Sequence, residues 1–201
     1  TGALTYTWNN GVVNNVPFPA TISGVYAVTG TDANGCTNSS SMNLTLNSLP
    51  TIGIAASATE VCDGNSVILS GTGAVNYSWS NGVVNGVAFI PSGTQTYQVV
   101  GTTANGCTNT AQITIAVNSL PSIIANASQT DVCTGGQVTL TGSGGTSYSW
   151  SDGVVNGVAF TPSTSQTYVV TGTNAGGCVA TDQILINVLP APNVLAGSDL
   201  S

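Results

Sequence analysis

The chain repeats itself every 71 residues, and this period constrains its fold more than any other feature. Trp8, Trp79 and Trp150 are 71 residues apart, and so are Cys36, Cys107 and Cys178. The segments TYTWNNGVVNNVPF, NYSWSNGVVNGVAF and SYSWSDGVVNGVAF are near copies of one another. A repeat of this length is one structural unit that packs mainly against its neighbours. We therefore interpret the 201 residues as a tandem array of small domains.

Leu-Pro steps recur where one repeat ends and the next begins, at Leu49-Pro50, Leu120-Pro121 and Leu189-Pro190. They predict two complete repeats with partial repeats on either side, so we expect the sequence to be a window on a longer array. The predicted segments are residues 1–50, the C-terminal part of an earlier repeat; 51–120 and 121–190, two complete repeats; and 191–201, the start of a following repeat.

Within a repeat, apolar and polar residues alternate with a period of two, as in Ile113-Thr114-Ile115 and Tyr77-Ser78-Trp79. This alternation is typical of half-buried antiparallel strands. Turn signals such as Asn81-Gly82 and Asn105-Gly106 separate the runs. About seven short strands and no helix are predicted for each repeat, which indicates an all-β sandwich. In the second repeat the predicted strands are 51–61, 66–71, 75–80, 83–84, 87–90, 96–103 and 108–118.

The aromatic residues all follow the repeat, which favours a role in the sandwich core. The alternative is that Tyr77 and Trp79 lie on the surface and stack on sugar rings. The predicted core aromatics are Trp8, Trp79, Trp150, Tyr77, Tyr97, Tyr148 and Tyr168.

The chain contains no lysine, arginine or histidine and seven acidic residues. Without basic residues it has nothing to neutralise phosphates, so the composition excludes nucleic-acid binding. It also lacks a Schiff-base lysine and a histidine that could activate a nucleophile or bind zinc. No apolar run approaches the roughly 18 residues that a membrane-spanning helix needs. We therefore predict a protein that is neither an enzyme nor inserted in a membrane.

Acidic side chains near one turn, Glu60 and Asp63, raise the question of a calcium site. However, Asp63 is replaced by Thr134 in the next repeat, and Asp32 by Thr103. A calcium ion that stiffened every joint should have ligands that recur. We therefore interpret these acids as solvated turn residues and predict no cofactor.

Each complete repeat carries two cysteines, which without histidine points to disulfides and an oxidising extracellular setting. Pairing within a repeat would join Cys62 to Cys107 and Cys133 to Cys178. Strand counting places these partners at opposite poles of a sandwich about 20 Å tall, whereas a disulfide spans at most about 7 Å between Cα atoms. This strand count therefore favours a bond between Cys62 and Cys178 that crosses the joint between two repeats, with Cys36, Cys107 and Cys133 paired outside the 201 residues. If residues 83–90 cross the sandwich once and not twice, the pairing within each repeat is favoured instead.

The run Tyr77-Ser78-Trp79-Ser80-Asn81-Gly82, then Thr96–Val100, then Asn105-Gly106-Cys107 resembles Ig-like and PKD-like repeats. Such repeats occur in giant secreted surface proteins of gliding bacteria that use type IX secretion. Val61-Cys62-Asp63-Gly64 and Ala196–Asp199 fit the same pattern. The sequence departs from the PKD signature, which favours a more acidic Trp-Asp-Phe-Gly-Asp-Gly. The resemblance implies an extracellular stalk or adhesin repeat and identifies no ligand.

These observations predict a structural repeat of a long extracellular fibre or adhesin at the cell surface, in contact with neighbouring repeats. A second hypothesis is a module that binds glycans or another surface. A third is a subunit of a filament or sheath that associates laterally with like fibres, because strands without lysines can pair at their edges.

Overall fold

The computed structural model describes residues 2–193, in which two three-residue 3-10 turns, η1 and η2, are the only elements besides strands. None of these elements is a helix of the length and hydropathy needed to cross a membrane. The strands are β1 (Thr5–Trp8), β2 (Gly24–Thr31), β3 (Thr37–Leu44), β4 (Gly53–Ala56), β5 (Glu60–Cys62), β6 (Val67–Thr72), β7 (Asn76–Trp79), β8 (Ala88–Phe89), β9 (Gln95–Thr102), β10 (Thr108–Asn118), β11 (Ile124–Ala127), β12 (Asp131–Cys133), β13 (Val138–Ser143), β14 (Ser147–Trp150), β15 (Ala159–Phe160), β16 (Gln166–Thr173) and β17 (Val179–Leu189).

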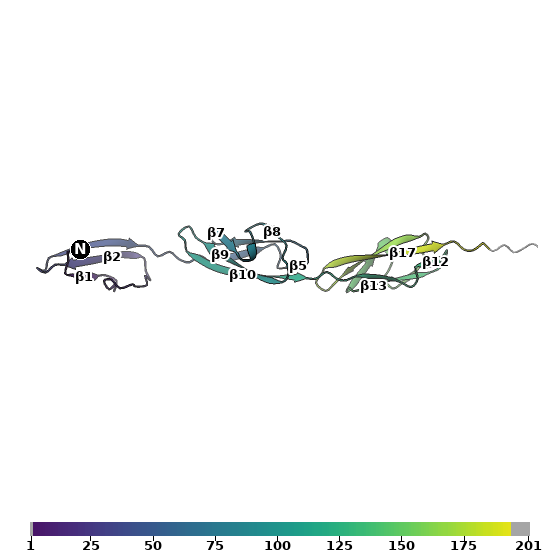
Figure 1. Ribbon diagram of the computed structural model, residues 1–201, viewed down its shortest axis with the longest axis horizontal. Coiled ribbons are helices and arrows are strands. Elements are labelled where there is room, and N and C mark those ends of the chain that lie inside the picture. The colour runs from purple at the N-terminus through teal and green to yellow at the C-terminus, as the bar shows by residue number, and fades with distance from the viewer. Residues whose placement is uncertain (1, 194–201) are drawn as a thin grey trace, which may run out of the picture. The chain divides into compact units, whose positions relative to one another are not determined.

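The third repeat is a β-sandwich of two sheets (Figure 1). One sheet has the strand order β11-β13-β15 and the other β12-β17-β16-β14. The pairs are antiparallel except for β12 and β17, which are parallel. The apolar faces of both sheets meet in one core, whose buried members are Ile123, Val132, Val138, Leu140, Trp150, Tyr168, Val170 and Ile186.

The second repeat has the same strand order, β4-β6-β8 and β5-β10-β9-β7. The described part of the first repeat, residues 2–50, holds one sheet, β1-β2-β3, whose strands correspond through the 71-residue period to β7, β9 and β10. The prediction of an all-β fold with repeated sandwiches of about seven strands is therefore confirmed. The segment predicted to begin another repeat, 191–201, lies mostly outside the described residues, as does Ala196–Asp199.

Two predicted strands of the second repeat differ from those observed. Residues 51–61 form two strands, β4 and β5, because the chain changes sheet between Ala56 and Glu60. Residues 83–84 form no strand and belong to the loop after η1 (Ser80–Gly82). Asn81 in that turn has φ = 57°, and its counterpart Asp152 in η2 (Ser151–Gly153) has φ = 56°. These short polar side chains are among the few that tolerate the left-handed conformation.

By compactness the chain divides into two units. Unit 1 comprises Thr1–Gly53, Thr72–Tyr77 and Val100–Thr110, and unit 2 comprises Ile54–Gly71, Ser78–Val99 and Ala111–Ser201. The third repeat and the disulfide-bearing end of the second repeat therefore belong to the same unit.

Candidate functional site

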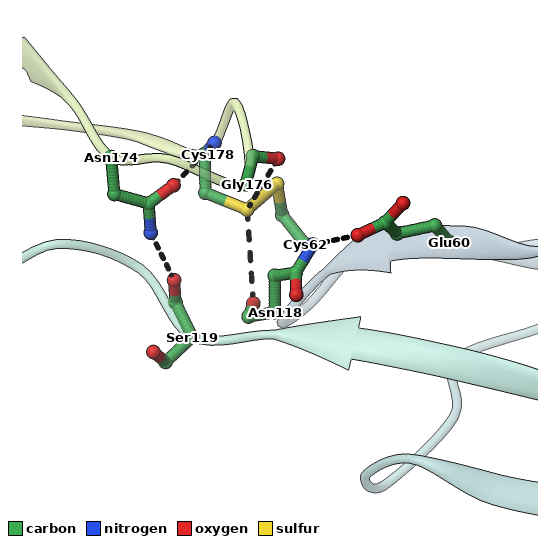
Figure 2. The surroundings of a disulfide bond; sticks show 7 residues. All are labelled: Glu60, Cys62, Asn118, Ser119, Asn174, Gly176 and Cys178. Atoms are coloured by element: carbon green, nitrogen blue, oxygen red, sulfur yellow. Dashed lines mark hydrogen bonds between the residues drawn. A yellow bond between two sulfur atoms is a disulfide. The ribbon is translucent and has the colours of Figure 1, made fainter.

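Unit 2 contains a disulfide bond that joins two different repeats, between Cys62 and Cys178 (Figure 2). Cys62 is the last residue of β5, and Cys178 immediately precedes β17. Their Cα atoms are 5.6 Å apart, within the usual range for a disulfide. The bond closes a covalent loop over a sequence separation of 116 residues.

Side-chain amides support the bond on both sides. Asn174 accepts the backbone N–H of Cys178 at its Oδ1 (3.0 Å) and donates through Nδ2 to the carbonyl oxygen of Ser119 (2.8 Å). The Nδ2 of Asn118 donates to Glu60 Oε1 (2.8 Å), and the Sγ of Cys178 lies 3.8 Å from the Asn118 carbonyl oxygen. The turn 174–178, which precedes β17, therefore contacts the linker after β10 directly. We call Glu60, Cys62, Asn118, Ser119, Asn174 and Cys178 the disulfide joint.

Strand pairing explains why the third repeat holds no internal disulfide. Cys133 pairs with Leu189 at the end of β17, whereas Cys178 precedes its first residue, Val179. The 11 residues of β17 place the two cysteines roughly 35 Å apart at about 3.3 Å per residue. In the second repeat, likewise, Cys62 pairs with Asn118 at the end of β10, and Cys107 precedes the first residue of that strand. The structure joins Cys62 to Cys178 and forms neither of the bonds within a repeat.

Unit 1 contains a similar set of contacts around Cys107. The Cys107 thiol lies 3.9 Å from the carbonyl oxygen of Asn47, and Asn47 precedes Asn118 by one period of 71 residues. The side chain of Asn109 donates to the carbonyl oxygen of Pro50 (2.9 Å), and that of Asn105 donates to Asn47 Oδ1 (3.1 Å). Cys107 therefore lies against its linker asparagine as Cys178 does, and its thiol is free.

The two remaining cysteines, Cys36 and Cys133, are also free, and both are exposed. The backbone N–H of Cys36 donates to Asp32 Oδ1 (2.9 Å), as that of Cys178 does to Asn174. Beside Cys133, Asn187 donates to Asp131 Oδ1 (2.8 Å). This bond is similar to that between Asn118 and Glu60, although Asn187 occupies the position of Ala116 and Leu189 that of Asn118. Cys36 thus has a turn contact like that of Cys178, and Cys133 lies beside an amide-to-carboxylate bond like the one beside Cys62.

The linker and turn asparagines were not predicted as site residues. Asn47 and Asn118 share one position in the 71-residue period, at or just beyond the end of a repeat's last strand, and this recurrence was a usable signal. Asn174 had no such signal, because its counterparts are Asp32 and Thr103.

The predicted core aromatics differ in burial. Trp79 and Trp150 are 9% and 6% exposed, so neither indole offers a face to a sugar ring. Tyr97 and Tyr168 are also buried, whereas Tyr77 and Tyr148 are half-buried. The hydroxyl groups of these half-buried tyrosines bind the backbone of the preceding turn, at Ala74 and Gly145 respectively.

Trp8 is only half-buried because one face of the β1-β2-β3 sheet carries a hollow. Its volume is about 470 Å³, and its lining includes Trp8, Phe18, Tyr26 and Met42. In the third repeat the matching face is covered by β13, whose Val138 and Leu140 are fully buried. The hollow is therefore the uncovered half of a sandwich core.

The acidic side chains between residues 2 and 193 do not gather into a cluster. Among residues 2–193, no three His, Cys, Asp or Glu side chains are close enough to hold a metal ion. Glu60 accepts the amide of Asn118, and Asp63 is exposed. The pKa of the Asp182 carboxyl is lowered because the backbone N–H groups of Ala125 and Gln183 donate to it. Asp182 thus links β17 to β11 of the opposite sheet.

No protein-family model matches the sequence, and no curated protein matches it. Solved structures of tandem extracellular domains are similar to it, at low identity. An adhesin with which an Antarctic bacterium binds ice has 16% identity and a TM-score of 0.37, over 84% of this chain and 57% of that one. Mouse CEACAM1b has 14% identity and a TM-score of 0.34, over 69% and 100%. Drosophila N-cadherin EC1-4 has 14% identity and a TM-score of 0.32, over 85% and 58%. The chain thus spans little more than half of the adhesin and cadherin structures, and with TM-scores this low the likenesses support no inference about it.

Proposed function

We propose that this chain is a non-catalytic structural segment of an extracellular, cell-surface adhesin or fibre, whose consecutive repeats are linked by disulfides across their joints. The observation that carries the proposal is the disulfide joint between Cys62 and Cys178. A bond inside a repeat would stabilise one domain. A bond between repeats fixes one domain against the next, which is what a stalk requires.

The proposal divides the array into complete repeats at 51–120 and 121–190, preceded by the back part of a repeat at 1–50 and followed by a new start at 191–201. The same bond accounts for the cysteines that have no partner in the chain. Cys107 and Cys36 occupy the position of Cys178 in other repeats, and Cys133 occupies the position of Cys62. Because such disulfides persist in oxidising surroundings, they support an extracellular location.

The location is tested on intact cells of the source organism with an antibody raised against this chain. We expect equal labelling of intact and lysed cells, because the epitope lies outside the cell. Labelling that requires lysis would contradict the proposal.

The structural role is tested by small-angle X-ray scattering on the oxidised chain and on the variant Cys62→Ser. Loss of the joint disulfide should broaden the distribution of maximum dimensions, because the second and third repeats then move independently. The matched control is Cys133→Ser, which removes an exposed free thiol and should leave the distribution unchanged. Equal distributions for the wild-type chain and Cys62→Ser would mean that the bond does not restrain the joint.

A further inference from the structure

Two valines are exposed in every repeat, in the loop that follows the tryptophan-bearing strand β1, β7 or β14. In the second repeat Val84 is 62% exposed and Val87 is 53% exposed. Their counterparts have nearly the same values, 61% and 54% in the third repeat and 62% and 54% in the first. We call these the valine pairs: Val13 and Val16, Val84 and Val87, Val155 and Val158.

Apart from the leucine of each Leu-Pro step, the other exposed large apolar residues of the second and third repeats are not kept in this way. Val75, Ile90, Val179 and Leu185 are all more than half exposed. Each is replaced by threonine at the equivalent position of the other of these two repeats (the sister repeat), at Thr146, Thr161, Thr108 and Thr114 respectively. In the first repeat the residues around the pair also change, since Asn15 replaces Gly86 and Pro17 replaces Ala88. The valines are retained while their exposed surroundings vary.

The loop itself does not require valine. The backbone N–H of Val87 donates to the carbonyl oxygen of Val84 (3.1 Å), so the pair occupies the two ends of a β-turn. The turn conformation is supplied by Asn85 and by Gly86, whose φ is +75°. Asn85 Oδ1 then holds the turn to the sandwich by accepting the Trp79 indole N–H (3.0 Å) and the Gly71 N–H (2.7 Å). The valines therefore project from a loop that is already fixed, which lowers the entropy lost when they bind something.

We propose that the valine pairs are contact points through which one copy of this chain binds a second copy. A stable protein interface uses roughly 20–30 residues from each side, and one pair offers two apolar side chains. A single pair is therefore too small to hold a partner, and several pairs must engage together. That requires a partner with apolar contact points spaced at the same period, and a second copy has this period by construction.

The chemistry of the pairs favours this occupant over others. Valine offers neither a hydrogen bond nor an aromatic face to a glycan. The segments 83–87 and 154–158 contain no charged residue. The one charge directly beside them is Asp152 in η2 of the third repeat, so two copies bring few like charges together at these loops. The inference does not depend on the proposed stalk function or on the disulfide joint.

The test is sedimentation velocity on the full oxidised chain from about 1 μM to about 1 mM. The free thiols are alkylated in every sample, so that intermolecular disulfides cannot contribute. The wild-type chain should associate reversibly with rising concentration. Replacing all six valines by threonine should weaken the association at least about tenfold, since apolar burial is lost at every contact. Replacing only Val84 and Val87 should weaken it less, as a multivalent contact requires.

The matched control replaces Val75, Ile90, Val179 and Leu185 by the threonine found in the sister repeat. It removes comparable exposed apolar surface and should leave the association within about twofold of wild type. Circular dichroism checks that each variant is folded. If the six-valine variant does not fold, the association of the two-valine variant is compared with that of the control instead. A wild-type chain that stays monomeric throughout the range, or a control that weakens association as much as the valine variants, would overturn the proposal.

Discussion

The amide oxygen of Asn156 lies 3.0 Å from the indole nitrogen of Trp150, and it also accepts the backbone N–H of Gly142 at 2.8 Å. One surface side chain thus satisfies the polar edge of the largest core residue and fixes the loop outside it. The second repeat makes the same pair of bonds at Asn85, and in the first repeat Trp8 donates to Asn14 (3.3 Å).

Replacing Asn156 by alanine should therefore destabilise the third repeat by about 1–3 kcal/mol, because the indole N–H and the Gly142 N–H both lose their acceptor. Denaturant unfolding followed by tryptophan fluorescence measures the loss. Asn126→Ala, on the exposed side of β11, is the control and should cost less than about 0.5 kcal/mol. If Asn126→Ala costs as much as Asn156→Ala, the two hydrogen bonds do not explain the effect.

The disulfide pairing can be read from a non-reducing digest of the thiol-blocked, denatured variant Cys36→Ser. Trypsin has no site in this chain, but cleavage before each aspartate separates all four remaining cysteines. We expect fragment 32–62 linked to fragment 152–181, as the bond between Cys62 and Cys178 requires. Fragment 32–62 linked to 63–130, or 131–151 linked to 152–181, would instead indicate bonds within a repeat.

Acid should destabilise the third repeat partly through Asp182. Because its folded pKa lies below the unfolded value, the ionised carboxylate contributes stability above the unfolded pKa. That contribution is lost as the pH falls through the folded pKa. Asp182→Asn should flatten this part of the stability profile, measured by thermal unfolding between about pH 6 and pH 2. The control Asp63→Asn removes an equal charge from an exposed turn and should keep the wild-type slope. An unchanged slope in Asp182→Asn would assign the acid sensitivity to other groups.

Two glycines with positive φ should differ sharply in their tolerance of alanine. A Cβ at Gly144 (φ +89°) would lie 1.8 Å from the carbonyl oxygen of Ser122, whereas at Gly153 (φ +71°) it would meet nothing within 4 Å. Gly153→Ala should cost about 1–2 kcal/mol from the left-handed conformation alone. Gly144→Ala adds a clash with backbone and should cost at least twice as much, as measured by denaturant unfolding. Similar losses for the two variants would show that the Ser122 backbone yields without cost.

The sequence was sufficient to predict the repeated sandwich, because its strand periodicity and most of its turn glycines agree between repeats. It did not predict where the chain changes sheet. Residues 51–61 carry no glycine or proline between Ala56 and Glu60 to mark the crossing from β4 to β5, and only the parallel partner strand β10 fixes where β5 lies.

The joint was less predictable for a different reason. The choice between Cys107 and Cys178 as the partner of Cys62 depends on the direction of each strand crossing, and the short segment 83–90 leaves that direction ambiguous in sequence. In the structure residues 83–87 form a loop and only Ala88–Phe89 form a strand, β8, so the strand predicted at 83–84 is absent. The hydrogen bonds from Asn174 to Ser119 and from Asn118 to Glu60 join residues 55 and 58 positions apart in sequence, so no local pattern indicates them.

The parallel pairing of β12 with β17 has a mechanical consequence. While the bond between Cys62 and Cys178 is closed, tension passes through it directly into β17. Once it is reduced, the load enters the third repeat ahead of β11 and leaves it at the far end of β17, so it pulls β12 and β17 in opposite directions along their axes. The hydrogen bonds from Asn187 to Thr130 (2.7 Å) and from Thr134 to Leu189 (2.9 Å) lie across that direction. They are therefore sheared together and do not open one after another. A domain built this way resists stretching until the whole strand slips, and each repeat with this pairing adds one such clamp in series.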